Sequence, residues 1–315
     1  MWRDRFPPAQ MTAAALSTSG QLKSVWRLGG LSPWQLARNV FRNIGTNNLL
    51  GLASDLAFNF IFALFPLILL MVTLFGLFAS RRVELQTDFL TYFADFLPPA
   101  AFQLLRATAL ELSANASGGK VTFGILFVLW FASGGVSSMI SALNLAYRVR
   151  ENRSWFKVRL IALGLTLLIS ILLLTALLVV LVSGHFVDWL GLELPLQPAV
   201  VLIWKTIQWP AAILFVVLSY SVIYYCGPDL KQRRWLWITP GSAFGAFLWL
   251  LASFAFRIYL HFFNTYNVEY GSLGGVMVLL VWLYVAGFAF LIGGEINAEI
   301  ERAAVRGATE QQQPA

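Results

Sequence analysis

A run of 25 residues from Tyr270 to Gly294 contains no charged side chain, and this run constrains the fold more than any other feature of the sequence. As an α-helix with a rise of about 1.5 Å per residue, it is long enough to cross a hydrocarbon layer about 30 Å thick. Its two ends carry features that hydrophobicity alone does not require. Glycines open the run in Tyr270-Gly271-Ser272-Leu273-Gly274-Gly275, and Glu295-Ile296-Asn297-Ala298-Glu299 follows it. The run therefore predicts a transmembrane helix with specialised ends.

The composition of the whole chain indicates an integral membrane protein. Of its 315 residues, 58% are hydrophobic and 12% are charged, whereas about 25% are charged in an ordinary soluble domain. One cysteine, Cys226, excludes an internal disulfide, and two histidines, His185 and His261, leave little for a metal site. We expect no cofactor and no metal. The net charge of +7 lies in short stretches beside hydrophobic runs, which favours a role in membrane orientation over nucleic-acid binding.

Apolar stretches of about 20 residues predict an all-α, polytopic protein with six transmembrane helices and additional interfacial helices. The predicted spans cover residues 54–78, 121–143, 160–182, 200–225, 236–256 and 271–294. The membrane domain extends over residues 32–302. We expect residues 1–31 to form a flexible cytoplasmic tail and residues 303–315 to form a polar cytoplasmic tail. Without a recognisable cleavage site near the N-terminus, the first span is expected to act as an uncleaved insertion signal.

Positive charge is distributed unevenly between the two sides that these spans define. Sixteen basic residues lie on the side of the N-terminus: Arg3, Arg5, Lys23, Arg27, Arg38, Arg42, Arg148, Arg150, Arg153, Lys157, Arg159, Lys231, Arg233, Arg234, Arg302 and Arg306. Five lie on the other side: Arg81, Arg82, Arg106, Lys120 and Arg257. Because loops rich in Lys and Arg stay in the cytoplasm, both termini are predicted to be cytoplasmic. The basic face predicts contact with anionic lipid headgroups.

Two regions outside the spans are predicted to be helical. Ser32-Pro33 precedes an apolar stripe at helical spacing, which predicts an interfacial helix on the cytoplasmic leaflet. The stripe comprises Trp34, Ala37, Val40, Phe41 and Ile44. In the outward loop 81–120, apolar residues at helical intervals before Pro98-Pro99 predict two short amphipathic helices.

Small residues recur four positions apart in three of the predicted spans. They are Ser133, Ser137 and Ser141 in the second span, Gly241 and Gly245 in the fifth, and Gly271 and Gly275 in the sixth. Small side chains allow helix backbones to approach closely in lipid. Two interpretations remain open: the contacts serve fixed helix packing, or they slide, as the helices of a rocking transporter must.

Polar residues toward the cytoplasmic ends of the spans form the candidate functional site, because such residues are costly to place in a bilayer. We predict an inner polar layer of Asp55, Asn59, Asn144, Tyr224, Tyr225, Glu295, Asn297 and Glu299. Pro66 follows Asn59 by about two turns and, because it cannot donate a backbone hydrogen bond, predicts a kink in the first span. The alternative interpretation is that each polar residue marks the interfacial end of a span.

Four colinear blocks of the chain carry a recognisable signature. The segment from Tyr266 to Arg302 begins Tyr-Asn-Val-Glu-Tyr-Gly-Ser-Leu-Gly-Gly and ends Gly-Gly-Glu-Ile-Asn-Ala-Glu-Ile-Glu-Arg. This segment resembles the C-terminal signature of the YihY/BrkB family of bacterial inner membrane proteins. The other blocks are Ala57-Phe58-Asn59 to Phe65-Pro66-Leu67, Ala142-Leu143-Asn144 to Arg153-Ser154, and Pro228-Asp229 to Pro240-Gly241. Asp55 is not among the residues that carry the resemblance, so its candidate role depends on physical reasoning alone.

The resemblance implies a six-span protein of the bacterial inner membrane whose activity is poorly defined. Labels in the family include a serum-resistance virulence factor, a proposed transporter and a tRNA-processing nuclease. A metal-dependent nuclease needs several carboxylate or imidazole ligands in an aqueous site, and both histidines are predicted to lie outside the cytoplasm. The chain also lacks a Gly-x-x-x-x-Gly-Lys-Ser/Thr phosphate loop. We therefore expect neither nuclease nor ATPase activity.

Three functions compete. The leading hypothesis is a transporter or exporter of a small solute, ion or lipid-like molecule, with Asp55, Asn59 and Glu295 at its inner gate. The second is a membrane scaffold that recruits cytoplasmic partners or anionic lipids. The third, a membrane-embedded enzyme, is not supported by a nucleophile–base pair or a metal cluster in the sequence. We expect no nucleic-acid partner and no enzymatic activity, and the sequence leaves the substrate and the oligomeric state open.

Overall fold

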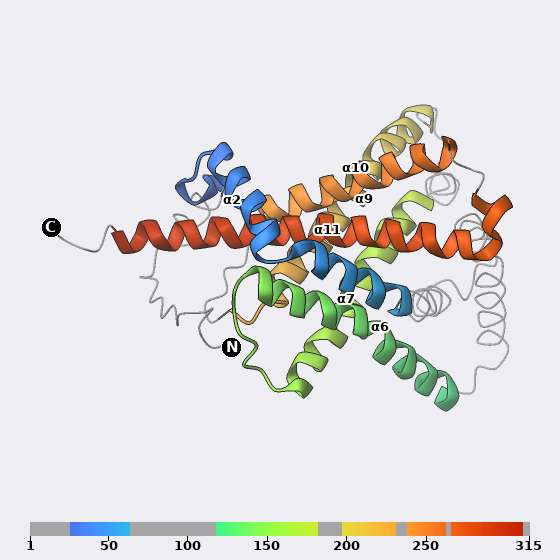
Figure 1. Cartoon of the computed structure of the whole chain (residues 1–315). Coiled ribbons are helices and arrows are strands. Elements are labelled where there is room, and N and C mark those ends of the chain that lie inside the picture. The colour runs from blue at the N-terminus through green and yellow to red at the C-terminus, as the bar shows by residue number, and fades with distance from the viewer. Residues whose placement is uncertain (1–25, 64–117, 182–196, 231–237, 263–265, 311–315) are drawn as a thin grey trace.

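The computed structural model describes residues 26–63, 118–181, 197–230, 238–262 and 266–310 (Figure 1). These residues form helices and connecting turns, with no strand within the described ranges. The labelled elements are η1 (Leu28–Gly30), α2 (Pro33–Thr46), α6 (Gly118–Ala146), α7 (Trp155–Leu181), α9 (Gln197–Cys226), α10 (Pro240–Phe262) and α11 (Tyr266–Glu310). An unlabelled apolar helix, Leu49–Ala63, lies between α2 and the first gap. The all-α prediction is confirmed for this part of the chain.

Five of the described helices are long and apolar enough to cross a membrane. The qualifying segments are Leu129–Ala146, Trp155–Val180, Thr206–Cys226, Pro240–Tyr259 and Met277–Arg306. They correspond to the second to sixth predicted spans. The helix Leu49–Ala63 contains the start of the first predicted span, and residues 64–78, which include Pro66, lie outside the described residues. The two amphipathic helices predicted within 81–120 lie almost wholly outside them as well.

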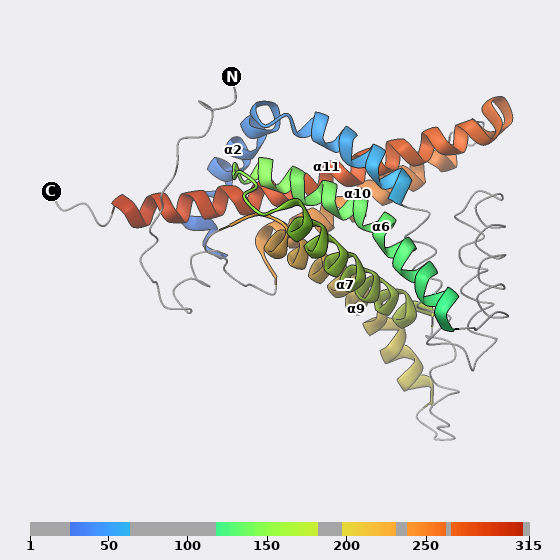
Figure 2. The same cartoon turned by 90° about the horizontal axis from the view of Figure 1, so that it is seen from below.

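The long helix α11 is the axis around which the other elements are arranged. It runs the length of the molecule in Figure 1 and contacts η1, α2, α6 and α10. On the other side of the bundle, α7 packs against both α6 and α9. Seen from below, α6, α7 and α9 diverge from α10 and α11 with distance from α2, so the bundle is tightest near α2 (Figure 2).

The largest buried cluster lies where four of these helices meet. Its members come from the helix Leu49–Ala63, α6, α9 and α11, and are Leu49, Ala53, Leu56, Ala142, Leu143, Ile223, Tyr224, Phe290 and Leu291. Lipid tails provide no hydrophobic driving force between helices, so dense packing of this kind stabilises a membrane bundle mainly by van der Waals contact. The cluster brings the polar residues at the adjacent helix ends close together.

α2 begins as the sequence predicts, and one of its faces packs on α11. Ser32 accepts a hydrogen bond from the Gln35 backbone N–H, the Gln35 side chain accepts one from the Ser32 N–H, and Pro33 fills the first helical position. The side chains that pack on α11 are Leu36 and Val40, together with the buried Asn43, whereas the predicted stripe includes Trp34 and Phe41, each 78% exposed. The facing helix α11 presents Ile296 and Ile300 to Leu36 and Val40. Trp34 and Phe41 therefore stay exposed on another face of α2, and the contact of the predicted stripe with the cytoplasmic leaflet stays a prediction.

Two of the helices differ in extent from the predicted spans. α10 begins at Pro240, after the non-helical residues 238–239, because the Thr239 side chain accepts a hydrogen bond from the Ser242 backbone N–H and caps the helix there. α11 continues from Tyr266 to Glu310, well past the predicted end at 294. It can do so because the polar residues after Gly294 find partners inside the protein.

Candidate functional site

The carboxylates of Glu295 and Glu299 are buried on α11, with exposed fractions of 0% and 3%. They lie one helical turn apart, so they occupy the same face of the helix. That face meets α2, where Asn39, Asn43 and the C-cap residue Asn47 are also spaced by four. The repeat of three amides on one face is the signal that the sequence analysis missed.

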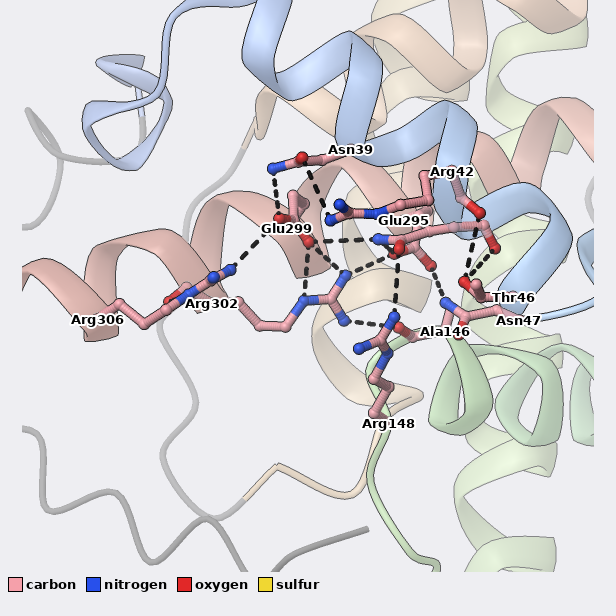
Figure 3. Close-up of polar contacts among 11 residues, drawn as sticks. Asn39, Arg42, Thr46, Asn47, Ala146, Arg148, Glu295, Glu299, Arg302 and Arg306 are labelled. Atoms are coloured by element: carbon pink, nitrogen blue, oxygen red, sulfur yellow. Dashed lines mark hydrogen bonds and ion pairs between the residues drawn. The ribbon is translucent and has the colours of Figure 1, made fainter. Parts of the chain in front are cut away.

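Every carboxylate oxygen of the two glutamates accepts a hydrogen bond (Figure 3). Glu295 accepts from Asn43 Nδ2 at 2.8 Å and from Asn47 Nδ2 at 3.0 Å. Glu299 accepts from Asn39 Nδ2 at 2.9 Å and from Asn43 Nδ2 at 3.4 Å. The amides thus tie α2 to α11 by contacts that apolar residues could not provide.

Arg302 completes this network from the same helix. Its guanidinium lies 2.5 Å from Glu295 Oε1 and 2.8 Å from Glu299 Oε2, and it also donates to the Ala146 carbonyl at 3.1 Å. Arg306 approaches Glu299 at 3.4 Å, and Arg148 donates to the Asn43 side-chain oxygen at 3.2 Å. Two buried negative charges are therefore balanced by arginines, which removes the severe penalty of an unpaired buried charge. We call these eight residues the glutamate network: Asn39, Asn43, Asn47, Arg148, Glu295, Glu299, Arg302 and Arg306.

Asn297 lies between the two glutamates in sequence and makes its contacts with α10. Its side-chain oxygen accepts from the Gly241 backbone N–H, and its Nδ2 donates to Thr239 Oγ1, both at 2.9 Å. A residue two positions from Glu295 lies on roughly the opposite side of a helix. The motif Glu-x-Asn-x-Glu therefore serves two interfaces, with the glutamates toward α2 and the asparagine toward α10.

Glycines bring α10 and α11 into very close contact beside Asn297. A Cβ built on Gly241 would lie 2.2 Å from the Gly293 carbonyl oxygen, and a Cβ on Gly293 would lie 3.0 Å from the Gly245 Cα. Next to them, the Tyr224 hydroxyl donates to the Phe290 carbonyl at 2.5 Å. Gly241 and Gly245 thus lie at a close helix contact, with Gly293 as the partner that the spacing pattern did not indicate.

A polar hollow lies between the helix Leu49–Ala63 and α6. Its volume is about 330 Å³, and it is lined by Leu52, Asp55, Leu56, Asn59, Ser137, Ser138, Ser141 and Ala142. Asp55 is exposed, and Asn59 donates to the Asp55 backbone carbonyl at 2.8 Å. Binding pockets are typically hollows with an apolar lining on which a few polar groups converge, and ionisable residues within membrane domains commonly mark functional sites. We call it the Asp55 hollow.

A third polar cluster holds the turn between α6 and α7. Asn144 donates to Glu151 at 2.8 Å and accepts from the Asp229 backbone N–H at 2.8 Å. Arg153 pairs with Glu151 at 2.6 Å and donates to the Gly227 carbonyl. The hydrogen-bonded Arg153 guanidinium lowers the pKa of the Glu151 carboxyl below its usual value. Asn144 therefore joins this turn to the segment after α9, which the sequence analysis did not anticipate.

The structure distributes the predicted inner polar layer over separate contacts. Asp55 and Asn59 share the Asp55 hollow, whereas Glu295 is fully buried and is not among the residues that line it. Asp55, Asn59 and Glu295 therefore do not meet in one site, as the predicted gate requires. The Glu295 carboxylate instead accepts hydrogen bonds from Asn43, Asn47 and Arg302. Tyr225 lies half-buried near the end of α9.

The predicted small residues also have different surroundings. Ser137 and Ser141 line the Asp55 hollow, while Ser133 is buried and donates to the Trp130 carbonyl at 2.7 Å. α6 lies close to the helix Leu49–Ala63 at Gly135, where a Cβ would lie 3.0 Å from Ala63 Cβ. Gly271 and Gly275 lie in the first turns of α11.

Together, the apolar helices and their buried polar contacts define a multi-pass helical membrane protein. Residues 40–315 match the family model described as virulence factor BrkB, and the chain belongs to this family. No solved structure matches the chain.

Curated relatives cover most of this chain. The putative ribonuclease-like protein YfkH of Bacillus subtilis (strain 168) is 32% identical over 252 residues, which cover 79% of this chain and 89% of that protein. A UPF0761 membrane protein of Coxiella burnetii (strain Dugway 5J108-111) is 26% identical over 87% of this chain and 95% of its own length. The match to a UPF0761 membrane protein of Paraburkholderia xenovorans (strain LB400), 26% identical, covers 84% of this chain but 60% of that relative.

Proposed function

We propose that this protein is a transporter or exporter that moves a small solute, ion or lipid-like molecule across the bacterial inner membrane. The observation that carries the proposal is the Asp55 hollow, in which a carboxylate, an amide and three serines face one space between two membrane helices. Charged groups inside membrane domains are costly and commonly mark the path of a substrate. A bundle that serves only as an anchor has no need of such a space.

The proposal assigns different tasks to the two groups of carboxylates. The Asp55 hollow contacts the substrate, and the glutamate network fixes α2 against α11 as one rigid unit. This division follows from hydrogen bonding, since the Glu295 and Glu299 oxygens are occupied by protein donors. Movement of the helix Leu49–Ala63 relative to α6 then opens or closes the hollow.

The proposal includes six spans with both termini in the cytoplasm. Five spanning helices and the apolar helix Leu49–Ala63 support the number of spans, and the positive charge on the loops supports the orientation. Cysteine accessibility would test it in a Cys226→Ser background. A cysteine added in the tail after residue 303 should react with a membrane-impermeant maleimide only after the inner membrane is opened, and reaction in intact spheroplasts would contradict this orientation.

Reconstituted protein in sealed vesicles provides the direct test of transport. Solid-supported membrane recordings would measure charge movement for panels of amines, carboxylates, sugars and inorganic ions, and fluorescent phospholipids would measure lipid movement. We expect at least one class to move faster than in empty vesicles, and Asp55→Asn to reduce that movement. If no class moves and Asp55→Asn has no effect in cells, transport should be abandoned.

A membrane scaffold is the second candidate, favoured by the exposed face of α2. Trp34 and Phe41 are each 78% exposed, beside the exposed Arg38 and Arg42, which suits contact with anionic lipids or a partner protein. Affinity purification in mild detergent would test it, since a scaffold should recover a partner in a fixed ratio. Recovery of no such partner would count against it.

We do not extend the ribonuclease-like name of the Bacillus subtilis relative to this chain, and we propose that the protein is not an enzyme. The predicted location of both histidines outside the cytoplasm supports this view. Incubation of purified protein with tRNA and divalent metal ions should leave the RNA intact. Cleavage of the tRNA by the wild type that is lost in Asp55→Asn would overturn the proposal that the protein is not an enzyme.

A further inference from the structure

We propose that the Asp55 hollow binds an organic cation that carries N–H donors, such as a protonated primary amine. This inference rests on the function proposed above, because it names the chemical class that the transporter would carry. It depends on three properties of the hollow: which polar atoms remain free, what charge they carry and how much space they enclose.

Most hydrogen-bond donors around the hollow are used by backbone carbonyls. Asn59 Nδ2 donates to the Asp55 carbonyl at 2.8 Å, Ser138 Oγ to the Gly134 carbonyl at 3.2 Å, and Ser141 Oγ to the Ser137 carbonyl at 3.2 Å. The second Asn59 N–H and the Ser137 hydroxyl are the side-chain donors left among the lining residues. Each of the five polar side chains still offers acceptor oxygens. The hollow is therefore richer in acceptors than in donors and suits a ligand that donates.

The charge of the hollow also favours a cationic ligand. Asp55 is its acidic residue, and neither Lys nor Arg is among its described lining residues. Among the described carboxylates, Glu151, Asp229, Glu295 and Glu299 each pair with an arginine, so Asp55 differs from these four. The Asp55 carboxylate is exposed and has no basic neighbour among the lining residues, so its charge is available to attract a cation that enters the hollow.

The size of the hollow favours an organic cation over a bare metal ion. The volume of about 330 Å³ compares with about 30 Å³ for one molecule of liquid water. A dehydrated alkali ion would leave most of this space to water. A small amine with a short carbon chain would fill more of it and would contact Leu52, Leu56 and Ala142 with its apolar part.

Binding to the purified full-length protein in detergent tests the inference with ethylammonium as the probe. We expect isothermal titration calorimetry to detect ethylammonium binding that Asp55→Asn weakens at least tenfold and Asp55→Glu partly preserves. Ser138→Ala and Ser141→Ala should weaken it several-fold. Ser54→Ala is the matched control, because the Ser54 hydroxyl makes the same kind of bond, to the Leu50 carbonyl, outside the hollow. An Asp55→Asn variant that melts like the wild type but binds ethylammonium equally well would overturn the proposal.

Three further probes test the chemical class. Tetramethylammonium carries the charge without N–H donors and should bind more weakly than ethylammonium, whereas equal binding would show that donors are irrelevant. Acetate should not compete, and competition by acetate would overturn the assigned charge. Potassium that displaces ethylammonium at equal concentration would identify a metal-ion site and overturn the organic ligand.

Different results would disprove the proposed transport and the proposed ligand class. If ethylammonium binds in a manner that depends on Asp55 but reconstituted protein moves no solute, the ligand class stands and transport is wrong. If vesicles accumulate a neutral or anionic solute while Asp55→Asn changes neither binding nor flux, transport stands and the ligand class is wrong.

Discussion

Glu295 on α11 and Asp55 on the helix Leu49–Ala63 are carboxylates of neighbouring helices with opposite surroundings. Glu295 is fully buried, and its oxygens accept from Asn43, Asn47 and Arg302. Asp55 is exposed and lines a hollow in which no described lining residue is basic. Both are uncommon positions for a charge, but the protein provides partners for one and leaves space beside the other.

The difference shows how to separate structural from functional polar residues in a membrane domain. A saturated carboxylate can accept a ligand only by giving up hydrogen bonds that hold helices together, which costs free energy. An open carboxylate can bind a cation without such a loss. We therefore expect substitutions in the glutamate network to affect folding first, and substitutions in the Asp55 hollow to affect ligands first.

The largest effect is expected from Glu295→Gln, which removes a charge with almost no change in shape. In this variant an amide nitrogen replaces one of the two carboxylate oxygens. That nitrogen faces either the Asn47 donor or the donors of Asn43 and Arg302, and Arg302 also loses part of its counter-charge. Removing one partner of a buried ion pair typically costs about 3–5 kcal/mol. The measurement is the free energy of unfolding in mixed micelles, followed by helix content.

Arg302→Lys is the companion variant for this prediction. It keeps a positive charge but cannot bridge both glutamates with one planar group, so it should destabilise less than Glu295→Gln. If Glu295→Gln unfolds at the same denaturant mole fraction as the wild type, the glutamate network is not a structural anchor, and Glu295 returns as a candidate for the gate.

The next effect concerns the contact between α10 and α11. Gly241→Ala places a methyl group 2.2 Å from the Gly293 carbonyl oxygen, which is backbone and cannot rotate away. Overpacking of this kind typically costs about 1–3 kcal/mol. Gly164→Ala on α7 is the control, because nothing lies within 4 Å of its Cβ and alanine favours a helix by up to about 1 kcal/mol. Equal melting temperatures for the two variants would show that the glycine contact is not tight.

Much of the fold was predictable from sequence because it depends on local patterns. Hydrophobic length predicted the five spanning helices, and Ser32 with Pro33 predicted the start of α2. The packed face of α2 was not predictable from its own sequence. Trp34 and Phe41 are more hydrophobic than Asn43, yet Asn43 is buried, because two glutamates more than 250 positions away require its amide.

The candidate site was predictable in composition but not in arrangement. The cost of polar groups in lipid indicated Asp55, Asn59, Asn144, Glu295 and Asn297, and each of them makes a specific contact or lines the hollow. A prediction by depth alone could not assign them to the Asp55 hollow, the Asn144 cluster, the glutamate network and the separate contact of Asn297 with α10. That assignment depends on which way each helix is rotated, and rotation is set by the packing of neighbouring helices.

A third carboxylate, Glu151, allows a smaller test by pH. Its pKa is lowered in the folded state, chiefly by its hydrogen bond to Arg153, so its contribution is present above the unfolded pKa of about 4.3. This contribution is lost as the pH falls through the lower folded pKa. The Glu151 side chain is partly exposed, so we expect it to be worth less than about 1 kcal/mol. The difference in melting temperature between wild type and Glu151→Gln should shrink from pH 6 to pH 3, and a growing difference would contradict the assigned pairing.

The smallest effect on stability is expected from Asp55→Asn, although it is the same chemical change as Glu295→Gln. The Asp55 side chain is exposed, and the bond from Asn59 goes to the Asp55 backbone carbonyl, which the substitution leaves in place. Surface substitutions without such contacts usually change stability by less than about 0.5 kcal/mol. The measurement is the same unfolding titration, made without amines in the buffer. A loss comparable to that of Glu295→Gln would mean that Asp55 is a structural residue, whereas an unchanged midpoint leaves its carboxylate free to serve a ligand.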